Sequence, residues 1–178
     1  MRFTKFFSTD NPKASKALEF GHLNAINYMA PNDSASTEDL NFSLCPHASP
    51  GCIALCLGKY SGQAAIVADL ENGTNAVRAS RIAKAQWFMT DRRAFMKEMT
   101  HHVSTLARKA ERLRLILVIR ADGSTDIGFE NVPTDNGQSL PIRFPTIQFD
   151  DYTKNLKRVL SPKRPPNYHL TFSLSETN

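Results

Sequence analysis

A long amphipathic helix that runs directly into an aliphatic strand constrains the fold of this chain most. Apolar residues recur at steps of three and four from Phe95 to Leu113, and Thr90 or Asp91 is a suitable N-cap. The uninterrupted run Leu115–Ile119 then indicates a strand covered on both faces, as in a parallel sheet. A helix that leads into such a strand predicts a right-handed crossover and therefore an α/β fold.

Other segments continue this alternation of strands and helices. We expect strands in 22–31, 146–154 and 167–178, a helix that begins near Asn75, and a short basic helix after residue 154. The fold class we predict is α/β, a partial (β/α) barrel-like parallel sheet with flanking helices and a cysteine loop after the first strand. We expect one domain over 1–178, with an irregular N-terminal arm at 1–19.

The three cysteines of the chain all lie in the stretch LCPHASPGCIALCLG, at Cys45, Cys52 and Cys56. Three clustered thiolates suit a four-iron, four-sulfur cluster with one iron left open for S-adenosylmethionine or another ligand. Zinc is the alternative, with His47 completing a Cys₃His set, although the spacing is not that of a zinc finger. The remaining alternative is three small buried thiols, which the clustering disfavours.

Polar side chains follow three of the predicted strands, and the cysteine loop follows another. In open parallel sheets, ligands bind beyond the carboxyl ends of the strands, so these segments are expected to meet at one rim. The same residues also fit turns that cap strands. As catalytic or ligand-binding candidates we take Asp126, Asp151, Lys154, His169 and Glu176; as cofactor-binding candidates, Arg120, Ser124, Thr125, Tyr152 and Ser173.

Charge and hydropathy limit the cellular setting. The net charge is +5, which attracts nucleic acid weakly, although a solvated basic surface explains it as well. No apolar run approaches the length of a membrane span, and residues 1–16 lack a signal-peptide core. We therefore expect a cytoplasmic protein that does not enter a membrane.

Five motifs, taken together, resemble the gene product 88 family of tailed phages and prophages. They are LCPHASPGCIALCLG, RASRIAKAQWFMTDRRAFM, RADGSTDIGFE, FPTIQFDDYTKN and PPNYHLTFSLSETN. The resemblance makes Cys45, Cys52 and Cys56 a matched motif and implies a phage protein made in the host cytoplasm, but it names no reaction. This chain has Asp122 where the pattern has Asn, and Asp150 where relatives have Tyr.

The resemblance also implies longer relatives, so we expect this chain to be either a natural short form or one that lacks a C-terminal part found in them. At the level of fold, cysteines after an early strand look like the front of a radical S-adenosylmethionine barrel.

The functional expectation is a phage-encoded metal-cluster protein with an iron–sulfur cluster beside a site for a small polar ligand or a macromolecular substrate. Radical S-adenosylmethionine chemistry would be its catalytic form. The alternative is a non-catalytic phage protein that binds a host protein or nucleic acid through the basic region 78–114, with structural cysteines. Whether the protein is an enzyme is left open by the sequence.

Overall fold

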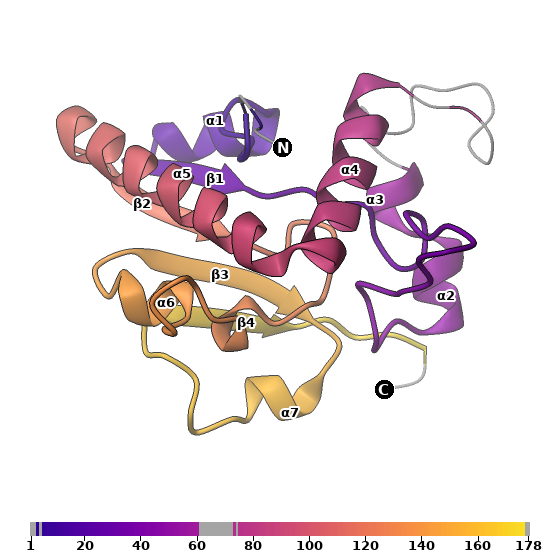
Figure 1. Cartoon of the computed structure of the whole chain (residues 1–178). Helices are drawn as coiled ribbons and strands as arrows, with labels where there is room; N and C mark the ends of the chain where they lie inside the picture. The colour runs from indigo at the N-terminus through magenta and orange to yellow at the C-terminus, as the bar shows by residue number, and fades with distance from the viewer. Residues whose placement is uncertain (1–2, 4, 61–72, 74, 177–178) are drawn as a thin grey trace.

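Four parallel strands form the centre of the molecule (Figure 1). The computed structural model describes residues 3, 5–60, 73 and 75–176. The strands are β1 (His22–Ile26), β2 (Ile116–Arg120), β3 (Gln148–Thr153) and β4 (Tyr168–Phe172), in the order β1-β2-β3-β4. Neighbours in the sheet are neighbours along the chain, and each pair is parallel, which is the arrangement of a segment of a (β/α) barrel. The predicted α/β class is confirmed, and the sheet does not close.

Two helices separated by a single residue, α4 (Ala76–Thr90) and α5 (Arg92–Leu113), pack beside the sheet: α5 lies along one face, and α4 lies at the end of the strands (Figure 1). Helix α4 begins at Asn75, whose side chain accepts a hydrogen bond from the Arg78 N–H. Helix α5 begins at Asp91, whose carboxylate accepts from the Ala94 N–H at 3.0 Å. The predicted helix start and the predicted break at Asp91 are therefore confirmed.

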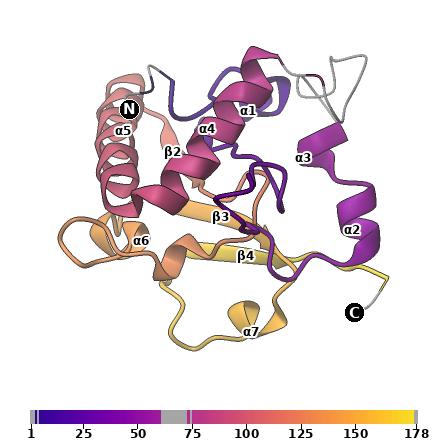
Figure 2. The same cartoon turned by 45° about the vertical axis from the view of Figure 1, so that its right-hand side comes forward.

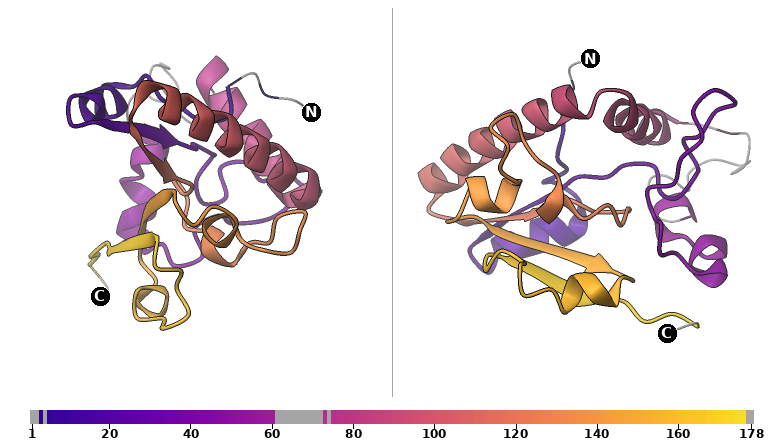
Figure 3. Two further views of the ribbon diagram at one scale, coloured as in Figure 1. Left: turned by 90° about the vertical axis from the view of Figure 1, so that its left-hand side faces the viewer. Right: turned by 60° about the horizontal axis from the view of Figure 1, so that its bottom comes forward.

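The apolar core lies between this helix pair and one face of the sheet (Figure 3). Alternate residues of each strand point into it, since successive side chains of a strand face opposite sides. Buried strand residues of the core are Leu23, Ala25, Leu117, Ile119, Phe149 and Tyr168, and the helices contribute Phe88, Phe95, Met96, Met99 and Val103.

The opposite face of the sheet is partly exposed, which corrects the expectation that β2 is covered on both sides. Ile116 of β2 is 58% exposed, whereas its neighbour Leu117 is buried. On β4, His169 and Thr171 are exposed, as the predicted alternation requires. A continuous aliphatic run therefore marks a strand of this sheet without proving that both of its faces are buried.

The N-terminal segment is more ordered than the irregular arm that we expected. Asn11 caps the short helix α1 (Pro12–Leu18), and the proline suits its first position because no N–H is needed there. Phe6 and Phe7 are buried in the core. The first strand, in contrast, ends at Ile26 and does not reach Pro31.

The cysteine window, which we expected to be a loop, contains two short helices. These are α2 (Pro50–Ala54) and α3 (Leu57–Tyr60). The remaining short elements are η2 (Phe129–Asn131), α6 (Leu140–Arg143) and α7 (Leu156–Val159), which lie between the later strands in the sequence. Within the described residues, no helix has the length and apolar character needed to cross a membrane.

Candidate functional site

The segments that follow the four strands meet beyond their carboxyl ends, as the parallel sheet predicts (Figure 2). We call this region the carboxyl rim and define it by residues 44–58, 121–128, 153–158 and 173–176. The Asp126 N–H donates to the Leu44 carbonyl at 2.8 Å, which joins the cysteine loop to the loop after β2. The Lys154 N–H donates to Asp126 Oδ2 at 3.1 Å, which adds the loop after β3.

Lys154 and Glu176 connect the rim to the segment that follows β4. The Lys154 ammonium donates to the Leu174 carbonyl at 3.0 Å and to the Ser173 carbonyl and hydroxyl at 3.3 Å. The Glu176 carboxylate accepts from the Gly51 N–H at 2.6 Å and from the Ser49 hydroxyl at 2.8 Å. Segments more than 120 positions apart therefore fix the start of α2, the helix that carries Cys52.

Glu176 approaches α2 closely because Gly51 has no side chain. A Cβ at this position would lie 2.7 Å from Glu176 Oε1. Hydrogen bonds from its own backbone amide, from the Gly51 N–H and from the Ser49 hydroxyl hold the pKa of Glu176 below its usual value. The carboxylate is therefore charged at neutral pH and is committed to α2.

All three cysteines are free thiols, and each is partly buried at the rim. Asn32 donates its N–H to Cys45 Sγ at 3.2 Å. Burial raises the pKa of Cys45 to about 12, and Cys56 adds to the shift as a second thiol nearby. Burial also raises the pKa of Cys52, although the positive charge of Lys154 opposes it. Both thiols are therefore protonated at neutral pH.

The thiols are not arranged around a single ion. Among the described residues, no group of three or more His, Cys, Asp or Glu side chains is placed to hold one metal ion. His47, the suggested fourth zinc ligand, is exposed, and its Nε2 lies 2.9 Å from Asn155 Nδ2. In a four-iron cluster, each cysteine binds a different iron atom. Such a site needs thiols that lie near one another, but the three sulfur atoms do not have to surround a single ion.

The hydroxyl groups of Ser124 and Thr125 stabilise the loop after β2 through hydrogen bonds. Ser124 Oγ donates to the Met29 carbonyl at 2.6 Å, and Thr125 Oγ1 donates to Asp122 Oδ1 at 2.7 Å. A Cβ on Gly123 would lie 2.6 Å from the Asn27 carbonyl oxygen, so only glycine permits this approach to the end of β1. Ser124 and Thr125 are thus at the rim, as expected, but are occupied with backbone and side-chain partners.

Asp151 lies in the core beneath the rim and not on its surface. Its side chain is buried at 1% exposure, Oδ1 accepts from the Asp122 N–H at 2.8 Å, and Oδ2 accepts from the Tyr168 hydroxyl at 2.5 Å. Burial, together with the nearby Asp122 carboxylate, raises the pKa of Asp151 well above its usual value. The carboxyl group thus ties β2, β3 and β4 together and is not accessible to a ligand.

Three predicted site residues lie on the partly exposed face of the sheet. Arg120 pairs with Asp150, and its guanidinium carbon lies 5.0 Å from the ring centre of Tyr152, which is 51% exposed. His169 is the β4 neighbour of Asp150. It precedes Ser173 by four residues, which places it about 13 Å from the rim at the usual rise of a strand. The structure therefore does not bring His169 to the cysteines.

The sequence did not single out Arg158, which organises the acidic part of the rim. Its Nε and Nη2 donate to the two oxygens of Glu130, both at 2.8 Å, and Nη1 pairs with Asp126. A third carboxylate, that of Asp122, lies 3.9 Å from Nη2. The sequence predicts a short basic helix here, but a charge pattern alone does not reveal partners some 30 positions earlier.

Comparisons with known proteins agree with the motifs. A family model described as gene product 88 matches residues 4–178. No curated protein and no solved structure matches the chain.

Proposed function

Since the chain belongs to the gene product 88 family, whose description names no reaction, we propose from the carboxyl rim that it is a metal-cluster protein. Cys45, Cys52 and Cys56 hold an iron–sulfur cluster, and a polar ligand binds beside it. The observation that carries the proposal is the assembly of the rim: all three thiols are free and lie where four parallel strands end.

The donor set fits such a cluster. Cysteine thiolates are the usual ligands of iron–sulfur clusters, and three of them leave one iron open. The Asn32 N–H that points at Cys45 Sγ is of the kind that stabilises a ligated sulfur and adjusts its reduction potential. Lys154, Asp126 and Glu176 supply charged groups at the same rim.

In its catalytic form, the protein would bind S-adenosylmethionine beside a cluster held by Cys45, Cys52 and Cys56. The cluster would supply one electron, drawn from an external reductant, for the reductive cleavage of S-adenosylmethionine to methionine and 5′-deoxyadenosine, with the added hydrogen atom coming from the substrate. The products methionine and 5′-deoxyadenosine, formed together with reductant present, would identify this chemistry.

Anaerobic reconstitution with ferrous iron and sulfide tests the cluster. We expect a brown protein with about four irons and four sulfides per chain. Cys52→Ser replaces the less buried of the two thiols with a raised pKa. We expect this variant to lose most of the bound iron while its circular dichroism spectrum stays unchanged. Ser104→Ala on α5 is the matched control, and it should retain the full iron content.

The zinc alternative gives a different result in the same experiment. A colourless protein that contains one zinc ion, and that loses this zinc in the His47→Ala variant, would indicate a Cys₃His zinc site in place of the cluster. A cluster without His47 as a ligand is expected to keep its iron in that variant. A protein that binds neither metal after reconstitution would leave the cysteines as structural thiols and contradict the proposal.

A further inference from the structure

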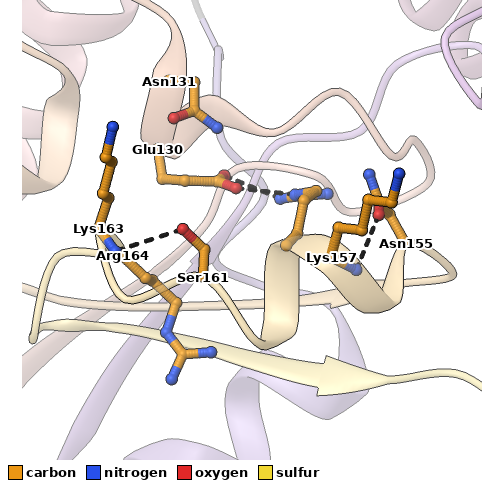
Figure 4. A pocket seen from close by; sticks show the side chains of 8 residues that line it. Glu130, Asn131, Asn155, Lys157, Ser161, Lys163 and Arg164 are labelled. Atoms are coloured by element: carbon orange, nitrogen blue, oxygen red, sulfur yellow. Dashed lines mark hydrogen bonds and ion pairs between the residues drawn. The ribbon is translucent and has the colours of Figure 1, made fainter.

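A basic hollow beside α7 is distinct from the cysteines and has no part in the proposed cluster. It has a volume of about 210 Å³, far more than the roughly 10–15 Å³ that one water molecule needs. Figure 4 shows Lys163 on one side of the hollow, Lys157 and Asn155 on the other, and Glu130 and Ser161 between them. From this hollow we infer a binding site for a phosphoryl group.

The charges around the hollow are unequal. Glu130 is the one carboxylate among its lining residues, and both of its oxygens accept hydrogen bonds from Arg158. Lys157, Lys163 and Arg164 add three positive charges. Within the described part of the chain, neither lysine ammonium has a hydrogen-bond or ion-pair partner, and the Arg164 guanidinium donates one hydrogen bond, to the Val159 carbonyl. The hollow therefore has positive charge that the protein does not neutralise.

The donors suit a phosphoryl group better than a carboxylate. A phosphate monoester has a charge near −2 and three strong acceptor oxygens at neutral pH. The Lys157 and Lys163 ammonium groups on either side of the hollow supply matching donors (Figure 4), and Arg164 adds positive charge at its edge. The Ser161 oxygen accepts from the Lys163 N–H at 3.3 Å, so its own hydrogen remains available for a ligand.

The backbone of this segment is preorganised. Pro162, Pro165 and Pro166 flank the two basic residues Lys163 and Arg164, and each proline has a fixed φ angle. The Arg164 N–H donates to the Ser161 carbonyl, and the Tyr168 N–H donates to the Pro165 carbonyl. A turn held in this way loses less conformational entropy when a ligand orders its side chains.

Isothermal titration with three probes tests the site: inorganic phosphate, adenosine monophosphate and a short single-stranded oligonucleotide. In the double variant Lys157→Ala with Lys163→Ala, we expect the affinity for the bound probe to fall about tenfold or more, since hydrogen bonds to charged groups are lost. The matched control, Lys97→Ala with Lys109→Ala, removes the same charge from exposed positions of α5 and should change affinity less than about twofold.

The probes also distinguish the two sources of the phosphoryl group. Saturable binding of adenosine monophosphate indicates a small phosphorylated ligand. Binding of the oligonucleotide alone, with steep dependence on salt, indicates the backbone of a nucleic acid. The site is overturned if no probe saturates, or if the α5 control weakens binding as much as the α7 variant does. Iron content plays no part in these results, so they are separate from the cluster experiment.

Discussion

Replacing Arg158 with methionine is expected to lower the free energy of unfolding by about 3–5 kcal/mol, the usual cost of removing one partner from a buried ion pair. The Arg158 side chain is 10% exposed, and those of Glu130 and Asp126 are 5% and 12% exposed. Methionine fills part of the volume but donates no hydrogen bond. Two largely buried carboxylates then remain near each other without the guanidinium that compensated them.

Urea denaturation of both proteins measures this loss. The midpoint should fall while the slope stays constant, since the surface exposed on unfolding is unchanged. Arg164→Met is the matched control, because Arg164 donates to a carbonyl and pairs with no carboxylate in the described structure. It should cost less than about 1 kcal/mol.

The pH dependence identifies the cause of the Arg158 effect. Burial raises the pKa of Asp122 and the charge of Arg158 opposes that shift, so the folded variant is expected to hold the Asp122 proton up to a higher pH than folded wild type does. The difference between wild type and Arg158→Met should therefore shrink as the pH falls. A difference that is the same at pH 7 and in acid would mean that lost packing, and not uncompensated charge, destabilises the variant.

The parts of the structure that the sequence predicted depend on local signals. Asp91 begins α5 because its carboxylate accepts the Ala94 N–H three residues later, a relation visible in the sequence. The segments that follow the strands were expected to meet at the rim because the carboxyl ends of parallel strands lie at one edge of a sheet. This rule applies without knowledge of any particular contact. Lys154, Asp126 and Glu176 were found in this way.

The parts that were missed depend on partners far away in the sequence. Asp151 and Asp150 are adjacent carboxylates, and the alternation of a strand places them on opposite faces. Which of them enters the core depends on Tyr168 of β4 and on Asp122 in the loop after β2. His169 was assigned to the site by its residue type, although its position in β4 places it well before the rim.

Lys84 is also buried, although nothing in the sequence around it indicates this. Its side chain lies in α4 at 5% exposure, with hydrogen bonds to the Phe6 carbonyl at 3.2 Å and to Asn27 Oδ1 at 3.1 Å. No carboxylate is among these partners. Burial, with a smaller contribution from the charge of Arg81, lowers the pKa of Lys84 from 10.5 to about 7.

This shift links stability to pH in a definite direction. Between pH 7 and 10.5 the unfolded chain holds the Lys84 proton and the folded chain does not, so the free energy of unfolding rises with pH. The slope approaches about 1.4 kcal/mol per pH unit in the middle of this interval and falls toward both ends, so the total change is about 4 kcal/mol. Below pH 7 both states hold the proton, and the contribution becomes constant.

Lys84→Met is expected to remove this slope. We compare the free energy of unfolding of the variant with that of wild type by denaturant unfolding at each pH. From pH 10 to pH 7, this difference should shift in favour of the variant by up to about 4 kcal/mol. Methionine also leaves Asn27 Oδ1 and the Phe6 carbonyl without a donor, at about 1–3 kcal/mol for each buried group. That cost does not change with pH, so it moves the whole curve and leaves the difference in slope as the signature of a buried amine. The exposed Lys97→Met serves as the control, and parallel pH profiles for all three proteins would show that Lys84 keeps an ordinary pKa.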